Sequence, residues 1–367
     1  MKRNLVMVLG SLAFSVVLLE ILLRLTGIEY KTFVVSDPDL GWSLRPGGEG
    51  WYRSEGEAYV RINQYGFRGP APTLQKPADT FRVAVLGDSF TVSLDVSDDA
   101  MMTSVLSRTL QACLRYRSKK VEVLNFGVGG HGTAQELLML RKRALAFQPD
   151  MVVLMFFAGN DVFDNSRGVR ESLVDEAPYF VQTAEGKLEL DDSFKRNQKF
   201  WLLNAAGTVL YHSRVLQIVN QVRKRAAVRS AIQGGVQTTP TTDPSRAGDL
   251  EQAWQVTDGL LGLIQEECKQ KGIPLVVGVI PFGYEVSPPT HTQTKGDNFE
   301  YRARLDEITG RWKIPTIQMR DALARYAAEK NVFLNGFPRT APGFGHWNET
   351  GNRVAGEVMG GFICGLP

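Results

Sequence analysis

A serine stands where a parallel sheet would present it to a substrate. The apolar run 82–86 (RVAVL) leads directly into 87–91 (GDSFT), which opens a helix-like segment. A side chain at the carboxyl end of a parallel strand faces the crevice where ligands bind, and a hydroxyl there can act as a nucleophile. The same residues also suit an ordinary strand-to-helix turn in which Asp88 or Ser89 is the cap. Residues elsewhere in the chain must decide between the two interpretations.

Three further blocks follow in order along the chain. A second apolar strand ends in 125–130 (NFGVGG), a third ends in 158–161 (AGND), and 346–351 (HWNETG) stands near the C-terminus. Together with 87–91, these blocks resemble the SGNH or GDSL hydrolase family of esterases, in its membrane-anchored bacterial form. Four ordered matches across about 270 residues are a more specific signal than any one motif.

The resemblance implies acyl transfer and gives each block a role. Acyl transfer needs an activated hydroxyl, a base and donors for the oxygen that becomes negative. Ser89 is the expected nucleophile and His346 the expected base. The expected oxyanion hole consists of the backbone N–H groups of Ser89 and Gly130 and the side-chain amide of Asn160. Gly130 suits this role because a residue without Cβ lets its amide approach a substrate.

The sequence departs from the family at the residues before the histidine. Family members usually carry an aspartate two or three residues earlier, where this chain has Phe344 and Gly343. Three interpretations stay open. A main-chain carbonyl near Gly343 could accept the Nδ1 hydrogen bond and give a Ser-His dyad, which we favour; a carboxylate from elsewhere, such as Asp164, could replace the aspartate; or the site could be degenerate.

The pattern of apolar runs predicts an α/β fold with a flavodoxin-like, doubly wound parallel sheet of five strands. The expected strands are 82–86, 121–126, 151–157, 275–280 and 314–318, with helices near 98–113, 133–146, 249–271, 319–330 and 349–363. We expect residues 1–28 to form a cytoplasmic tip and membrane anchor, and 29–79 a lead-in hairpin layer with a structural role. Residues 80–367 are the expected hydrolase domain. Within it, 162–249 is a helical, lid-like insertion with helix-like runs at 197–231 and a mobile surface loop at 234–244.

The N-terminus predicts a membrane location. Lys2 and Arg3 precede an apolar run, and Leu5 to Leu23 would span about 28 Å as a helix, close to the hydrocarbon thickness. No small-residue cleavage site follows, so we expect an uncleaved signal anchor. The basic residues favour a cytoplasmic N-terminus. The hydrolase domain would then face the periplasm or cell exterior of a bacterium, with the chain in the inner membrane.

Composition excludes several classes of function. The net charge of +3 is mild, so no nucleic-acid partner is expected. The basic stretch around 214–229 is an amphipathic helix whose cations would lie in solvent or on anionic headgroups. Three distant cysteines, Cys113, Cys268 and Cys364, are expected to be buried and unpaired. The four histidines show no metal-ligand spacing, so neither a metal nor a cofactor is expected.

Three functions remain open at this stage. The leading one is hydrolysis of acyl esters, O-acetyl esters above all, on envelope carbohydrate or lipid. An O-acyltransferase of an exopolysaccharide pathway would use the same serine, with a sugar hydroxyl in place of water. A catalytically degenerate glycan-binding assembly protein is the third.

Overall fold

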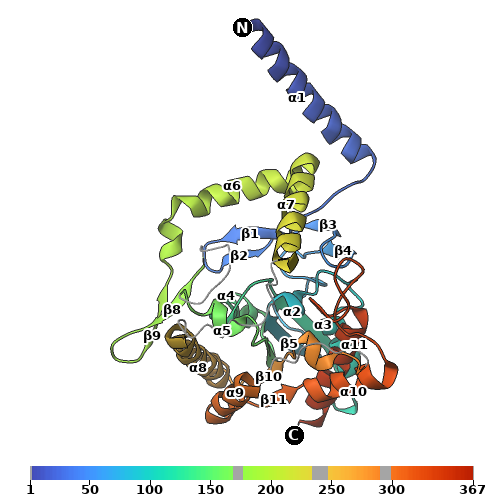
Figure 1. Ribbon diagram of the computed structural model, residues 1–367. Helices are drawn as coiled ribbons and strands as arrows, with labels where there is room; N and C mark the ends of the chain where they lie inside the picture. The colour runs from blue at the N-terminus through green and yellow to red at the C-terminus, as the bar shows by residue number, and fades with distance from the viewer. Residues whose placement is uncertain (1, 168–176, 234–246, 290–298, 367) are drawn as a thin grey trace.

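Five parallel strands form the centre of the molecule. The computed structural model describes residues 2–167, 177–233, 247–289 and 299–366 (Figure 1). The sheet has the order β11-β10-β7-β5-β6. Its strands are β5 (Thr80–Gly87), β6 (Lys120–Gly127), β7 (Met151–Phe156), β10 (Leu275–Val279) and β11 (Thr316–Gln318). Numbered by appearance, the order is 2-1-3-4-5, so the predicted flavodoxin-like, doubly wound arrangement is confirmed.

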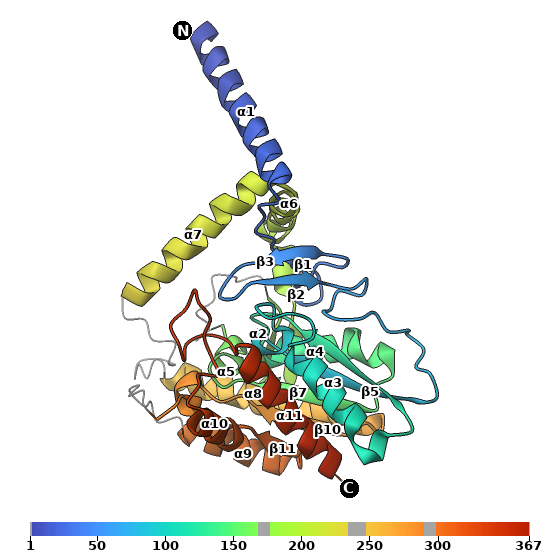
Figure 2. The same cartoon turned by 90° about the vertical axis from the view of Figure 1, so that its right-hand side faces the viewer.

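Both faces of the sheet are covered by helices. Side chains alternate along the buried strands, so that neighbouring residues of one strand lie in different apolar clusters. Leu86 and Leu154 face one apolar cluster, whereas Val85 and Val153 face the other. Three helices pack on the second face: α3 (Met102–Ala112), α10 (Arg320–Lys330) and α11 (Glu349–Gly365). Helices α4 (Thr133–Lys142), α8 (Ala247–Gln270) and α9 (Phe299–Arg311) pack on the first. Figure 2 shows α3 and α11 in front of the sheet. Of these six helices, α9 is the one that the sequence pattern did not predict.

Short helices connect the main elements. They are α2 (Ser89–Val92), α5 (Asp161–Asp164), η1 (Leu114–Tyr116), η2 (Ala144–Phe147), η3 (Ser193–Arg196) and η5 (Gly283–Val286).

The lead-in segment forms two antiparallel hairpins. β1 (Val34–Asp37) pairs with β2 (Gly41–Leu44), and β3 (Glu49–Tyr52) pairs with β4 (Ala58–Arg61). Arg68, which follows them, is buried, and its guanidinium donates to the carbonyls of Val92, Ser93 and Val96 and pairs with Asp98. A buried guanidinium with several acceptors holds its surroundings firmly. The lead-in segment is therefore fixed to the loop that follows α2.

The insertion after β7 carries a hairpin and two helices. Its elements are β8 (Tyr179–Gln182), β9 (Leu188–Asp191), α6 (Gln198–His212) and α7 (Arg214–Gln233), so the helix-like runs at 197–231 are confirmed as two helices. The loop expected at 234–244 lies outside the described residues. α6 packs against β1, and α7 packs against the N-terminal helix (Figure 1).

The N-terminal helix α1 (Lys2–Leu25) leaves the body as an isolated rod in both views (Figures 1 and 2). Among the described residues it is the one helix long and apolar enough to cross a membrane, and none of its most apolar 18-residue window is buried. Length and composition alone also fit a signal sequence.

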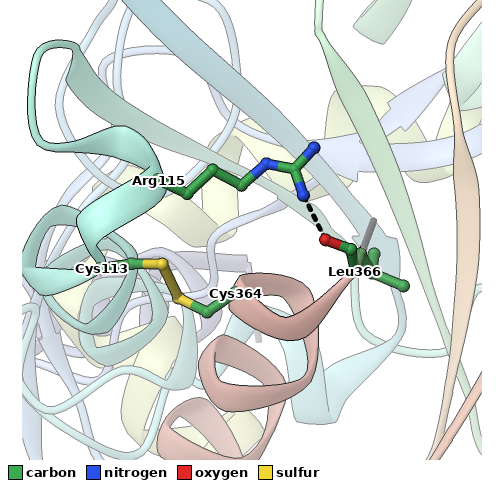
Figure 3. The surroundings of a disulfide bond; sticks show 4 residues. All are labelled: Cys113, Arg115, Cys364 and Leu366. Atoms are coloured by element: carbon green, nitrogen blue, oxygen red, sulfur yellow. Dashed lines mark hydrogen bonds between the residues drawn. A yellow bond between two sulfur atoms is a disulfide. The ribbon is translucent and has the colours of Figure 1, made fainter.

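The expectation of three unpaired cysteines is wrong for two of them. Cys113 and Cys364 form a disulfide, with Cα atoms 6.1 Å apart and a sequence separation of 251 residues (Figure 3). The pairing arises because α3 and α11 pack side by side on one face of the sheet, so that their C-terminal ends meet. Arg115 donates to the carbonyl of Leu366 beside the disulfide. Cys268 is free and buried, as expected.

Candidate active site

Ser89 lies at the carboxyl end of β5, as the first residue of α2. Asp88 caps this short helix, because its carboxylate accepts the backbone N–H of Phe90 at 2.8 Å. The Ser89 Oγ lies 2.8 Å from Nε2 of His346. The capping role expected of Asp88 is present, and beside it Ser89 keeps its hydroxyl free to contact a base.

His346 comes from the loop before α11, which several hydrogen bonds fix. Gly336 donates its N–H to the His346 carbonyl at 3.0 Å, and Asn348 caps α11 by accepting the N–H of Gly351 at 3.1 Å. The imidazole packs against the ring of Phe90, with centroids 5.1 Å apart. The side chain stays 31% exposed, so a substrate can reach it.

Glu55 takes the place of the missing aspartate. Its Oε1 lies 2.9 Å from His346 Nδ1, and its Oε2 accepts the His346 backbone N–H at 2.9 Å. The favoured expectation of a main-chain carbonyl near Gly343 is therefore wrong. A carboxylate from elsewhere does occupy the position, but it is Glu55 and not Asp164, which instead lies beside Gly132.

The reach of Glu55 depends on the loop that Arg68 holds. Asp95, in that loop, accepts the backbone N–H groups of Glu55 at 3.0 Å and of Gly56 at 2.8 Å. Gly345 has a left-handed φ of +76°, and a Cβ on it would lie 2.2 Å from Glu55 Oε2. Only glycine at this position gives the carboxylate room to contact the histidine.

No sequence pattern pointed to Glu55. It lies in the turn between β3 and β4, in a segment to which a structural role was assigned. Acidic residues in turns are common, and neither spacing nor periodicity distinguishes Glu55 from Glu57 two residues later. The only available signal was indirect: a histidine with no acid before it needs one from another element.

The residues expected to form the oxyanion hole also meet here. Asn160 Nδ2 donates to Asp88 Oδ2 at 3.1 Å. An amide nitrogen carries two hydrogens, so the second can be donated to a substrate oxygen. Gly130 has a left-handed φ of +77°, and a Cβ on the preceding Gly129 would lie 3.7 Å from the Ser89 Cβ. The ends of β5, β6 and β7 therefore bring three of the sequence blocks to one edge of the sheet, and the loop before α11 brings the fourth, with His346, to the same place.

Charge changes the acid-base behaviour of His346. Burial alone would lower its pKa, but the hydrogen bond and charge of Glu55, with the charges of Asp95 and Asp88, raise the pKa to about 9. For Glu55, burial acts to raise the pKa, yet the contacts with His346 leave that pKa below its ordinary value. Each partner stabilises the charged form of the other.

Other acids behave differently. Glu136 and Asp161 are buried, and burial together with neighbouring carboxylates raises the pKa of each well above its ordinary value. Burial likewise raises the pKa of Asp88. In the described part of the chain, no group of three or more His, Cys, Asp or Glu side chains could hold a metal ion.

A small cavity adjoins the Ser89–His346 pair. Its volume is about 10 Å³. Its walls are Ser89, Phe90, Ser93, Asp95, Val96, His346, Trp347 and Asn352. A space of this size admits one water-sized group.

Comparison with known proteins gives a family. The model of the GDSL-like Lipase/Acylhydrolase family matches residues 85–354, a range that begins after Glu55. The chain is similar to the solved acetyl xylan esterase AlAXEase, at 13% identity and TM-score 0.42, over 77% of this chain and 100% of that one. It is similar to Axe2, an acetylxylan esterase from Geobacillus stearothermophilus, at 11% identity and TM-score 0.42, over 78% and 95%. A lipase/acylhydrolase from Enterococcus faecalis has 15% identity and TM-score 0.39, over 78% and 96%. No sequence among the curated proteins matches.

Replacement of Glu55 should change both the rate and its pH dependence. The wild-type kcat/KM should rise with pH toward about 9, because His346 accepts the serine proton only when it is neutral and its pKa is raised to about 9. Glu55→Gln removes the charge, so the rise should move down toward the ordinary histidine pKa of about 6.5. The kcat of this variant should fall on the order of 10⁴-fold.

The matched control for Glu55→Gln is Glu57→Gln. Glu57 lies in the same turn but pairs with Arg53 and Arg339 at the surface. This control should keep the wild-type pH profile. An unchanged profile in Glu55→Gln would contradict the assignment of Glu55 as the partner of His346.

Replacement of Asn160 tests the oxyanion hole. Asn160→Ala should lower kcat by roughly 10²–10³-fold, about 3–4 kcal/mol of transition-state stabilisation, with little change in KM. Steady-state kinetics on a short-chain aryl ester measures the effect, and circular dichroism checks the fold. A change confined to KM would mean that Asn160 only holds substrate.

Proposed function

Since this chain belongs to the GDSL-like lipase/acylhydrolase family of carboxylic ester hydrolases, we propose that it is a serine esterase working through an acyl-enzyme. The observation that carries the proposal is the continuous chain from Ser89 through His346 to Glu55. Its two contacts measure 2.8 Å and 2.9 Å. A degenerate binding module has no need of a nucleophile, base and acid in this geometry.

The contacts assign a step to each residue. Neutral His346, with its proton on Nδ1 and held by Glu55, takes the hydroxyl proton of Ser89 at Nε2 as Oγ attacks the ester carbonyl. The carbonyl oxygen becomes negative and is held by the backbone N–H groups of Ser89 and Gly130 and the amide of Asn160. The imidazolium then gives its proton to the leaving alcohol. A water molecule, deprotonated by the same imidazole, then attacks the acyl carbonyl. The bond to Oγ breaks, the carboxylic acid leaves, and the imidazolium returns its proton to Oγ.

The surroundings of the nucleophile favour a small acyl group. The cavity beside Ser89 and His346 measures about 10 Å³, and the rings of Phe90 and Trp347 help to close it. An acyl group that entered this cavity could be no larger than acetyl, since the space admits one water-sized group. We propose O-acetyl esters of envelope carbohydrate or lipid as the substrates.

Two observations support a body outside the cytoplasm and a retained anchor. The Cys113–Cys364 disulfide fits an oxidising compartment. Near the end of α1, Glu20 and Arg24 hydrogen-bond to the body at residues 212–215. Removal of α1 as a signal peptide would take Glu20 away from the backbone N–H groups of Arg214 and Val215, which donate to it. We propose a single-pass protein of the bacterial inner membrane with its catalytic domain in the periplasm.

Loss of the nucleophile tests the enzymatic proposal. Purified full-length protein in detergent should hydrolyse a short-chain aryl ester and should be labelled by a fluorophosphonate. Ser89→Ala should abolish both, because among the described residues Ser89 is the one whose hydroxyl forms a hydrogen bond with His346. Ser93→Ala is the matched control, since Ser93 lies on the cavity wall but bonds to Asn352. Wild-type turnover in Ser89→Ala would overturn the assignment.

Location is tested in cells. Of two reporter enzymes fused after Pro367, the one that functions outside the cytoplasm should be active and the one that functions inside it should be inactive. The protein should also sediment with membranes and keep its N-terminus. Thiol labelling of the denatured protein should detect three cysteines after reduction but only Cys268 before it, because the other two are paired. Recovery of the body in the soluble fraction without residues 1–25 would establish a cleaved signal peptide.

A further inference from the structure

The polar and apolar sides of α7 are inverted relative to an ordinary surface helix. Gln217 is buried and accepts the N–H of Tyr30, and Gln221 donates to the carbonyl of Arg53. These residues, one turn apart, define the side that faces the body. The opposite side carries Leu216, Val219 and Val222, which are 41%, 50% and 61% exposed. A water-facing helix normally has the reverse arrangement.

Helix α6 also carries exposed apolar side chains. Phe200 is buried, but Trp201, Leu202 and Val209 are 53%, 70% and 57% exposed. The two helices together, residues 198–233, contain six Lys and Arg and no Asp or Glu. Exposed apolar side chains in a segment with only positive charges are the composition of an element that lies on anionic lipid.

The corner where α6 meets α7 lies beside the C-terminal end of α1. Glu20 of α1 accepts the backbone N–H groups of Arg214 and Val215, each at 3.1 Å, at the start of α7. It also accepts the hydroxyl of Ser213 at 3.2 Å, and Arg24 donates to the carbonyl of His212 at 2.6 Å. Glu20 is the first charged residue after the apolar run of α1. If α1 spans a bilayer, the corner lies where that helix leaves the hydrocarbon.

We propose that α6 and the first half of α7 are a second membrane contact, which lies in the outer headgroup region of the bilayer that α1 spans. The inference rests on the proposed anchor but is independent of the esterase activity. Figure 1 shows α6 running across the side of the body from which α1 departs. Two contacts on different elements hold the body in one orientation, whereas a single helix would let it swing about its tether.

The test uses the full-length protein in nanodiscs that contain anionic phospholipid. Nitroxide labels are placed at Leu202→Cys and Val219→Cys, and the matched control is Val181→Cys on β8, whose side chain is 46% exposed, similar to Val219. Collision with oxygen reports lipid, and collision with a water-soluble nickel chelate reports solvent. The ratio of oxygen to nickel collisions should be several-fold higher at 202 and 219 than at 181. Cys268 adds little background because it is buried.

A fourth label separates the two ways of failing. Leu12→Cys lies in α1 and reports the anchor alone. If the label at position 12 has a high ratio of oxygen to nickel collisions while the labels at 202 and 219 have low ratios, the second contact is overturned and the anchor stands. If Leu12 also reads as solvent, both are overturned. If the label at 219 collided with neither oxygen nor the nickel chelate and showed spin–spin broadening, a second copy of the chain would cover α7. This result would also overturn the proposal.

Discussion

The hydrogen bond between Glu55 and His346 joins two parts of the chain that the sheet alone would not connect. Ser89, His346 and Asn160 all lie in the part of the chain built on the parallel sheet. The acid comes from a hairpin that precedes the first core strand. Several other contacts serve this one: Arg68 holds the loop after α2, Asp95 in that loop holds the turn, and Gly345 leaves room for the carboxylate.

Electrostatics separates Glu55 from the other acids near the sheet edge. Burial acts to raise the pKa of Glu55, Asp88, Glu136 and Asp161 alike. Only Glu55 has its pKa lowered overall, because it alone among the four contacts a group that can become a cation. An imidazolium at His346 therefore meets a carboxylate that is already charged. Asp88 makes a different contact, since it accepts one hydrogen of the Asn160 amide.

The features that the sequence could predict are those that local pattern encodes. Continuous apolar runs predicted the bounds of β5, β6, β7, β10 and β11 to within a few residues. The blocks that follow β5, β6 and β7 identified residues that meet at one edge of the sheet. Glu55 and the Cys113–Cys364 disulfide could not be predicted in this way. Both depend on which surfaces pack together: the hairpin turn against the histidine loop, and the end of α3 against the end of α11. A pairing across 251 residues leaves no mark in local spacing.

The acid comes from the segment that precedes the sheet, so the contact to His346 depends on an intact connection between the two. A fragment that began at β5 would retain Ser89, Asn160 and His346 and the whole parallel sheet, yet its histidine would lack a carboxylate. If a protease cut between β4 and β5 and the two pieces separated, the piece with the sheet would therefore lack the carboxylate that contacts His346. A cut between α1 and β1 would instead leave Glu55 joined to the sheet, so the two cleavage positions differ in whether His346 keeps its carboxylate partner.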